Sequence, residues 1–502
     1  MADAQNRKSD ASADSLMEPR KDWKFTQWFK KMPTQGMMPD ADTLSAVSFD
    51  SEGKFLATGD RGGRIVVLES DPVMGKTKPG GVHFKFHAEF QSHEAEFDYV
   101  RSLAIEERIS KIRWLAPTND SLFLLSTNDR AIKLWKVHRK PNDVVTSWNI
   151  DRDTGRGPSK ASELKLPVTE TAGDSMVVAT LKRNFAPDVH AFHINSLAVN
   201  SDGETFLSAD NLRINLWNAN IPDKAFNIID TKPANMQDLT EVITCADTHP
   251  TGCHQFLYAT SKGTVRLGDT RERAVLDHFT KVFAAAEPGA NGASSGQEKS
   301  FFSDVTLSIS DAKFTPNGMG IVTRDFMTVK VWDVRTEKKP LETICVHEYL
   351  RPKLWDLYEN DCVYDGFEVG ISSEGNITTG SYNNYFHIYD LKGKTDTWAE
   401  ASKVPIGVFP INPALWTGSK NGVKKKRASR TGARSLFSRK HRSKDGKDSP
   451  SEDANAGPTP PAINPENLDY TSKVLHCAWH PKLNCVAVAG ANNLFLYSAA
   501  NT

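Results

Sequence analysis

The side chains that could do chemistry lie scattered along this chain of 502 residues. It contains no GxSxG nucleophile turn, no Walker phosphate loop, no HExxH zinc pair and no Gly-rich turn between a strand and a helix. The six cysteines include no CxxC pair, which is typical of reduced thiols and not of disulfides or a zinc site. Adjacent acids such as Glu106 and Glu107 lack a spacing suited to acid/base catalysis, and a solvated face accounts for them. We therefore predict no catalytic residue, no metal site and no cofactor, and interpret the chain as a binding protein.

Two His-Pro pairs, His249-Pro250 and His480-Pro481, resemble each other because they follow similar apolar segments. Equivalent positions in a repeated unit call for equivalent structural contacts. We interpret both histidines as structural residues of the repeat and not as a catalytic pair.

Charge is distributed unevenly, although the formal net charge is zero. The segment from Lys420 to Lys447 holds twelve Lys or Arg residues and one acid, Asp445, so its charge is +11 and the remaining chain carries −11. An acidic platform attracts basic partners and repels the phosphates of nucleic acids. We predict a partner with basic segments and no nucleic acid.

The elements that must position these charges recur seven times as an apolar run, a turn with Asp or Asn, and a second apolar run ending near Trp-Asp or a relic of it. The clearest copies are Leu124 to Lys136, Phe206 to Asn218 and Ile321 to Asp333. Weaker copies are Leu56 to Glu69, Leu257 to Asp269, Ile377 to Asp390 and Ala487 to Ser498. This WD-repeat pattern predicts an all-β fold, a seven-bladed WD40-type β-propeller with four-stranded blades.

Such a ring is stable only when it closes, since a single blade cannot bury both faces of its sheet. The last repeat ends almost at the chain terminus and lacks a strand. The N-terminal stretch from Trp23 to Phe29 has the alternation of a strand, and we predict that it completes this blade; a surface aromatic cluster is the alternative.

The repeats are longer than the roughly 40 to 45 residues of a minimal blade, so the ring must carry insertions. We predict a polar tail over residues 1–20 and a propeller over 21–502 that contains three of them. Residues 138–189 form two arms of alternating apolar and polar residues around a turn-rich centre, which predicts a projecting hairpin. Residues 284–299 predict a flexible loop. Residues 398–469, which include the basic run, predict a disordered segment.

No secretion signal and no apolar run of roughly 18 residues is visible, so we expect no membrane partner and a cytoplasmic location. The basic run Lys424 to Arg427 is open to two interpretations, a nuclear-import signal or a solubilising linker. Serines among the basic residues, Ser429, Ser435 and Ser438, could be reached by kinases.

Long irregular motifs give a more specific resemblance. They are FDYVRSLAIEERISKIRWL (Phe97 to Leu115), HINSLAVNSDGETFLSADNLRINLWN (His193 to Asn218), DTKPANMQDLTEVIT (Asp230 to Thr244), VHEYLRPKLWDLYENDC (Val346 to Cys362) and TGSYNNYFHIYD (Thr379 to Asp390). With these motifs the chain resembles the WD-repeat regulatory B subunit of protein phosphatase 2A, the 55-kilodalton class.

The resemblance implies a non-catalytic subunit that joins a helical-repeat scaffold subunit and a catalytic subunit in a Ser/Thr phosphatase. It implies that a hairpin from the second blade grips the scaffold, and that an acidic groove on the top face receives phosphoprotein substrates with basic segments.

Carried over by motif, the resemblance places the substrate groove on Arg61, Ser102, His193, Asp210, Leu239, Val242, Arg351, Tyr358, Glu359 and Asp361. The acids would hold substrate Lys or Arg, and the apolar members would fix register. A turn carboxylate that caps its own backbone, like those expected at Asp129 and Asp325, is the alternative for Asp210. The chain departs from the family at Asn211, where a second acid is usual, and at Gly366, where Lys is usual.

Two alternative functions are considered. One is a stand-alone enzyme that uses the propeller channel as its active site, which the missing catalytic groups disfavour. The other is a WD-repeat adaptor of another complex, such as a ubiquitin-ligase substrate receptor.

Overall fold

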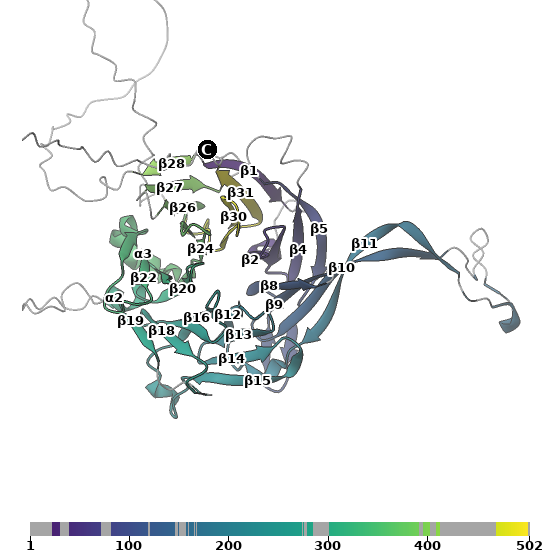
Figure 1. The fold of residues 1–502 in the computed structure, drawn as a ribbon, viewed down its shortest axis with the longest axis horizontal. Coiled ribbons are helices and arrows are strands. Elements are labelled where there is room, and N and C mark those ends of the chain that lie inside the picture. Colours follow the sequence, from purple (N-terminus) through teal and green to yellow (C-terminus); the bar gives the residue numbers. More distant parts are fainter. Residues whose placement is uncertain are drawn as a thin grey trace, which may run out of the picture.

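The computed structural model describes residues 23–30, 40–71, 82–118, 121–145, 168–273, 279–284, 301–390, 395–401, 408–411 and 468–499, with isolated stretches between 149 and 166 and residue 275. In this part of the chain the strands form seven antiparallel sheets of four or five strands, arranged as the blades of a ring (Figure 1), and one additional two-stranded sheet. The seven-bladed propeller predicted from the repeats is thereby confirmed. No helix among the described residues is long and apolar enough to cross a membrane.

The blades follow the chain, and each begins with its innermost strand. Blade 1 is β2 Leu44–Phe49, β3 Phe55–Asp60, β4 Arg64–Ser70 and β5 Phe84–Gln91; blade 2 is β8 Lys111–Thr118, β9 Ser121–Thr127, β10 Ile132–Val145 and β11 Thr169–Asn184; blade 3 is β12 Ile194–Val199, β13 Thr205–Asp210, β14 Arg213–Asn218 and β15 Ile221–Asp230; blade 4 is β16 Ile243–Thr248, β17 Gln255–Thr260, β18 Thr264–Asp269 and β19 Lys281–Ala284. Blade 5 is β20 Ile309–Phe314, β21 Gly320–Asp325, β22 Thr328–Asp333 and β23 Glu342–Cys345; blade 6 is β24 Val369–Ile371, β25 Ile377–Gly380, β26 Tyr385–Asp390, β27 Thr395–Glu400 and β28 Val408–Ile411; blade 7 is β29 Cys477–Trp479, β30 Cys485–Gly490, β31 Asn493–Ala499 and β1 Trp23–Lys30.

Blade 7 joins the two ends of the chain. Strand β1 pairs antiparallel with β31, from Trp23 opposite Ala499 to Lys30 opposite Asn493, with a bulge after Phe25. The N-terminal segment therefore supplies the outer strand that the last repeat lacks, which confirms the predicted closing strand.

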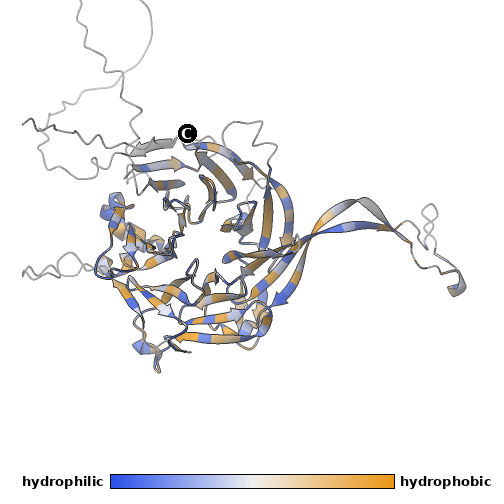
Figure 2. Ribbon diagram, in the orientation of Figure 1, coloured by the Kyte–Doolittle hydropathy of each residue, from blue (hydrophilic) through white to orange (hydrophobic). Residues whose placement is uncertain are grey.

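Each blade is buried on both faces because it lies between two neighbours. In β3, every position is buried; Leu56 packs in a cluster with Ala487 and Leu496 of blade 7, whereas Ala57 packs with Ile112 of blade 2. The strands of the ring carry apolar segments interrupted by polar residues (Figure 2). Continuous burial explains why these repeats read as apolar runs and not as a strict alternation.

Polar contacts connect successive innermost strands. The hydroxyl groups of Ser45, Ser196 and Ser310 donate to the backbone carbonyls of Ile109, Ala246 and Phe367, within or just before the first strand of the next blade, over 2.7, 2.7 and 2.8 Å. These bonds satisfy buried backbone groups that no strand ladder reaches.

Strands β10 and β11 continue together beyond blade 2 as a projecting hairpin (Figure 1). Their pairing runs from Lys133 opposite Asn184 to Val145 opposite Thr169. The first part, up to Val137 opposite Ala179, also pairs with β9, so the second arm supplies the fourth strand of the blade. Residues 179–184, which the predicted hairpin insertion 138–189 includes, are therefore part of the four-stranded blade.

Other predicted segments fall mostly outside the described residues. The tail 1–20 and almost all of the loop 284–299 lie outside them, as do 412–467 of the basic insertion. The boundary at Trp398 needs correction, because Trp398 is a buried residue of β27 and pairs with His387.

Short helices and one small hairpin occupy the connections between blades. They are η1 Asp40–Asp42, the hairpin β6 Glu96–Asp98 with β7 Leu103–Ile105, η2 Ala161–Glu163, η3 Pro187–Val189, η4 Met236–Asp238, α2 Phe301–Thr306, η5 Glu348–Lys353, α3 Leu354–Glu359 and η6 Cys362–Tyr364. Except for η2, which lies between the arms of the β10–β11 hairpin, each precedes the first strand of a blade.

Candidate functional site

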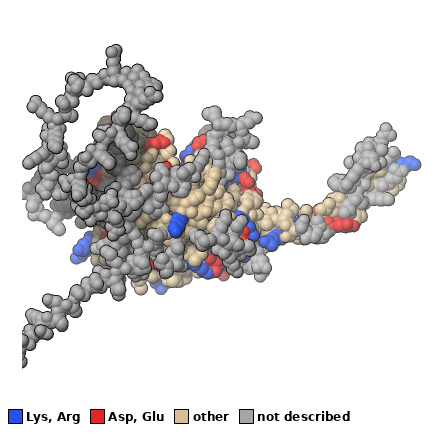
Figure 3. Space-filling view, turned by 90° about the horizontal axis from the view of Figure 1, so that it is seen from above, with Lys and Arg blue, Asp and Glu red and all other residues tan. Residues whose placement is uncertain are grey.

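One face of the ring collects the predicted binding residues. Because the four strands of a blade alternate in direction, the turn between its second and third strands lies on the same face as the connection to the next blade. All ten predicted groove residues lie in these turns and connections or at their ends. We call this side of the ring the top face. The rim, seen edge-on in Figure 3, carries charges of both signs.

The first group of predicted residues spans blades 1 to 3. Arg61 follows β3 and its guanidinium lies 2.9 Å from the Asp40 carboxylate. Ser102 is exposed at the turn of the β6–β7 hairpin, with a positive φ of 52°. His193 precedes β12, and its Nδ1 lies 2.7 Å from Asp129 of the β9–β10 turn.

Asp129 is an acid of this face that was not predicted as a groove residue. Burial raises the pKa of its carboxyl, but the hydrogen bond and charge of His193, followed by the charge of Arg108, outweigh burial and hold the pKa below its usual value. Asp129 is therefore ionised at neutral pH and stays partly exposed.

Asp210 behaves differently from the other predicted acids, since it is completely buried. Its Oδ1 accepts the backbone N–H groups of Leu212 and Arg213 at 2.8 and 2.7 Å, and its Oδ2 lies 2.8 Å from His190 Nδ1. This placement agrees with the alternative interpretation, a turn carboxylate that caps its own backbone. Asp210 presents no surface to a substrate.

Asp129 was expected to cap its turn in blade 2 as Asp210 does in blade 3, but the capping residue of that turn is the preceding one. Asp325 caps Met327 and Thr328 as Asp210 caps its own turn, but in blade 2 the capping side chain is Asn128, which accepts from Arg130 and Ala131 at 3.0 and 2.7 Å. Asp129 thus corresponds to Asn211, the next residue in the turn, and not to Asp210.

Leu239 and Val242 lie in the connection from blade 3 to blade 4, and both are partly exposed. The backbone of Val242 is fixed by Ser261, whose hydroxyl accepts its N–H at 3.1 Å. Between them, Glu241 forms an ion pair with Arg266. This connection offers apolar contacts beside an acid that is already neutralised.

The connection from blade 5 to blade 6 holds the remaining four residues. Arg351 forms a two-pronged bond with Glu348, at 2.7 and 2.8 Å, so part of its charge is compensated. Tyr358 packs against Phe302 of α2, whereas Glu359 and Asp361 are exposed. Asp361 has a positive φ of 57°, a conformation in which Asp and Asn are less strained than most residues.

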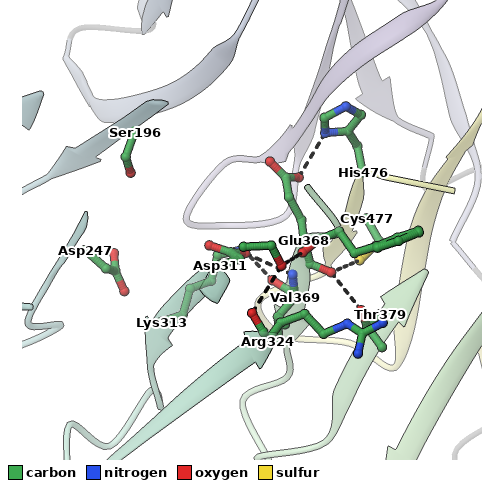
Figure 4. Close-up of polar contacts among 12 residues, drawn as sticks. Ser196, Asp247, Asp311, Lys313, Arg324, Glu368, Val369, Thr379, His476 and Cys477 are labelled. Carbon is green, nitrogen blue, oxygen red and sulfur yellow. Dashed lines mark hydrogen bonds and ion pairs between the residues drawn. The ribbon is translucent and has the colours of Figure 1, made fainter. Parts of the chain in front are cut away.

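A network of charged side chains, which was not predicted from the sequence, lies at the channel (Figure 4). Lys111, which begins blade 2, forms an ion pair with Glu368, which directly precedes blade 6. The second carboxylate oxygen of Glu368 lies 3.2 Å from His476 Nδ1, at the entrance of blade 7. The Lys111–Glu368 ion pair thus links two blades that are not neighbours, and no local sequence pattern predicts it.

Neighbouring carboxylates in the channel serve the same structural purpose. Asp247 and Asp311 accept the backbone N–H groups of Phe314 and Val369 in the following blades, at 3.0 and 2.9 Å. Lys313 lies 3.2 Å from Asp311. One pocket of the channel, lined by Lys111, Asp247, Asp311 and Glu368 among others, has a volume of about 20 Å³, which is room for about one water molecule.

The protonation of the channel groups follows from this pairing. Burial alone would raise the pKa of Glu368, but the charges of Lys111 and His476 outweigh it and hold the pKa well below its usual range. Burial raises the pKa of the nearby Cys477 thiol to about 12. A carboxylate engaged in ion pairs and a protonated thiol supply neither a general base nor a nucleophile.

Among the described residues, no group of three or more His, Cys, Asp or Glu could hold a metal ion. The two His-Pro pairs also have the structural role predicted for them. The backbone N–H of Gly252 donates to His249 Nδ1, so Nε2 carries the proton toward the carbonyl of Gly318, 3.3 Å away. His480 repeats this arrangement in blade 7, where Nε2 lies 3.0 Å from the carbonyl of Gly53.

Known proteins similar to the chain share nearly its whole length. No protein-family model matches it. It is 41% identical over 515 residues to the serine/threonine-protein phosphatase 2A regulatory subunit phr2AB of Dictyostelium discoideum, covering 95% of this chain and 98% of that protein. It is 42% identical over 494 residues to the regulatory B-type subunit of protein phosphatase PP2A from Schizosaccharomyces pombe, covering 97% and 99%.

A third relative is the protein phosphatase PP2A 55 kDa regulatory subunit of Drosophila melanogaster, 43% identical over 461 residues, with 91% of this chain and 83% of the relative covered. The chain belongs to the family of 55 kDa regulatory B subunits of protein phosphatase 2A.

Proposed function

We propose that the chain specifies substrates in a heterotrimer with the scaffold and catalytic subunits of protein phosphatase 2A. In this role it holds phosphoproteins with basic segments on the top face, near the catalytic subunit. The observation that carries the proposal is that Glu359 and Asp361 are exposed on the same face as Asp129, while the rest of the chain outside the basic segment carries −11. Exposed carboxylates attract basic segments and speed their encounter.

The β10–β11 hairpin is our candidate for the contact with the scaffold. Its distal part carries exposed apolar side chains, among them Val144, Val168 and Met176, which are 45%, 53% and 51% exposed. Apolar side chains projecting from a ring without neighbours are typical of a protein-binding surface. The scaffold would bury them.

Neither alternative function receives support of this kind. An enzyme with its active site in the channel would need free space and a reactive group there, whereas the pocket beside the Lys111–Glu368 ion pair leaves room for about one water. No specific observation in the described part of the chain favours a ubiquitin-ligase adaptor.

Charge removal at the top face tests the proposal. Glu359→Gln retains the acceptor for the Trp355 indole N–H, now 2.7 Å away, and Asp361→Asn retains a residue that tolerates a positive φ. Two exposed ion pairs contribute about 1 kcal/mol together, so KM for a phosphopeptide with basic flanks should rise about fivefold. A small phosphate ester, which needs no docking, should be hydrolysed at the unchanged rate.

The matched control is Glu204→Gln with Asp223→Asn, two exposed acids on the opposite face of the ring. It should leave KM for both substrates unchanged. An unchanged KM for the phosphopeptide in the top-face variant would remove Glu359 and Asp361 from the substrate path.

A further inference from the structure

The outward side of α3 and of the residues after it forms a surface that combines acids with exposed aromatic rings. We define the α3 surface as Trp355, Asp356, Glu359, Asp361 and Tyr364. Trp355 is 58% and Tyr364 62% exposed, although a helix in a folded core would bury such rings. Aromatic rings next to carboxylates suit Lys and Arg side chains, which gain both ion pairs and cation–π contacts.

The α3 surface is held rigidly from below. Phe302 of α2 packs edge-on against Trp355 and Tyr358, with both ring centroids 6.0 Å away. Leu357 is fully buried in a cluster with Phe326 and Tyr382. A ligand therefore meets a preformed surface and need not order it on binding.

The chain returns from its basic insertion beside this surface. Leu468 and Tyr470, the first described residues after the insertion, pack against the same cluster as Leu357. The Tyr470 ring lies 5.7 Å from the Tyr382 ring, and the Tyr382 hydroxyl donates to the carbonyl of Cys362, in the connection that carries Asp361. The end of the insertion is thus fixed next to α3.

The basic segment of the insertion is close enough along the chain to reach the α3 surface, and its charge is opposite to that of the acids there. Twenty residues separate Lys447 from Leu468, and a chain of that length spans about 70 Å at most. The segment Lys420 to Lys447 carries +11. Tethering at this distance gives the segment an effective concentration on the order of millimolar at the α3 surface.

We propose that the chain's own basic segment, Lys420 to Lys447, docks on the α3 surface and competes there with the basic segments of substrates. The competition rests on the proposed function of the top face, whereas the docking itself does not. Phosphorylation within the segment weakens the docking, because a phosphate on Ser429, Ser435 or Ser438 adds about −1.5 to −2 charges to it.

Direct binding tests the docking. The protein used is the full chain in which the twelve Lys and Arg of 420–447 are replaced by Gln, and the probe is a fluorescent peptide of residues 420–447. The peptide should bind, and Glu359→Gln with Asp361→Asn should weaken binding at least fivefold. The Glu204→Gln, Asp223→Asn variant should bind the peptide like its parent, and a peptide phosphorylated on the three serines should bind less tightly.

Two outcomes of this binding measurement would overturn the docking. One is absence of binding at millimolar peptide and low ionic strength. The other is an equal loss of affinity in the top-face variant and in the opposite-face variant, since the attraction would then belong to the net charge of the ring and not to the α3 surface.

Kinetics of the holoenzyme test the competition. Neutralising the twelve basic residues should lower KM for a phosphopeptide with basic flanks about threefold or more, with kcat unchanged and a small phosphate ester unaffected. Adding Glu359→Gln and Asp361→Asn should abolish this gain. If the peptide binds at α3 but neutralisation leaves KM unchanged, competition is refuted. If KM for the phosphopeptide does not change when Glu359 and Asp361 are replaced, these residues do not bind substrate, although the docking of the basic segment still stands.

Discussion

The indole ring of Trp23 packs edge-on against the indole ring of Trp479, with centroids 5.4 Å apart and an angle of 88° between the planes. Trp23 begins the N-terminal strand β1 and Trp479 ends the innermost strand of the same blade. The first and last described segments thus meet in one packed core, which also includes Val486 and Phe495. Closure of the ring is a hydrophobic contact as well as a ladder of hydrogen bonds.

The first prediction concerns this closure. Trp23→Ala should lower the free energy of unfolding by about 3 to 5 kcal/mol, because it removes a buried aromatic side chain and leaves a cavity. Trp28→Ala on the same strand is the control; Trp28 is 40% exposed, and its replacement should cost less than about 1 kcal/mol. Denaturant unfolding measures both. Equal costs would mean that pairing of β1 with β31, and not the Trp23 core, closes the ring.

The blades could be predicted from sequence because their signals are local. In the copy from Phe206 to Asn218, both strands and the capping turn lie within a few residues, and the capping Asp210 needs no distant partner to be recognised as a turn residue. Closure by Trp23 to Phe29 is a long-range pairing and was predictable for a different reason: the last repeat lacks one strand, and the N-terminal segment is an unused strand.

The site was less predictable because side-chain direction within a turn changes from one residue to the next. Asp210 points into the blade toward His190, while Asp129, one place further along in the equivalent turn of blade 2, pairs with His193 at the top face. The Lys111–Glu368 ion pair depends on how the closed ring sets non-neighbouring blades opposite each other, which no local pattern specifies.

A second prediction separates stability from recognition at Asp210. Asp210→Ala removes the cap of two backbone N–H groups and leaves the buried His190 without its carboxylate partner. Unfolding free energy should fall by about 3 kcal/mol or more. At a temperature where the holoenzyme stays folded, KM for a basic phosphopeptide should not change. An increase in KM without loss of stability would show that Asp210 contacts substrate after all.

Hairpin deletion provides the third prediction, and the structure defines where to cut. Replacing residues 141–175 with an Asn-Gly turn keeps the part of β11 that completes blade 2, because Val177 opposite Arg139 remains paired. The shortened protein should unfold within a few degrees of the parent temperature but should no longer co-purify with the scaffold subunit. Undiminished assembly would refute the proposed contact.

A longer deletion, of residues 138–188, is the informative comparison. It also removes the outer strand of blade 2 and Phe185, which is fully buried against Phe206 and Trp217. We expect this variant to lose stability strongly, so its failure to assemble would say nothing about the hairpin.

The last prediction concerns acid stability and His93, a buried residue just before the β6–β7 hairpin. Burial, followed by the charge of Lys133, lowers the pKa of His93 to about 3, whereas an unfolded chain has a His pKa of about 6.5. Below pH 6.5 the unfolded state binds a proton that the folded state does not bind. The contribution of His93 to stability is therefore complete above pH 6.5 and is lost as the pH falls toward 3.

Between pH 7 and pH 5 this loss amounts to about 2 kcal/mol. A His93→Gln variant cannot take up that proton, so its unfolding free energy should fall by about 2 kcal/mol less than that of the parent over the same interval. Denaturant unfolding of both proteins at pH 7, 6 and 5 measures the difference. Other buried histidines, such as His347, whose pKa burial also lowers, contribute equally to both proteins and cancel. Parallel pH profiles would show that His93 reaches solvent and titrates normally in the folded ring.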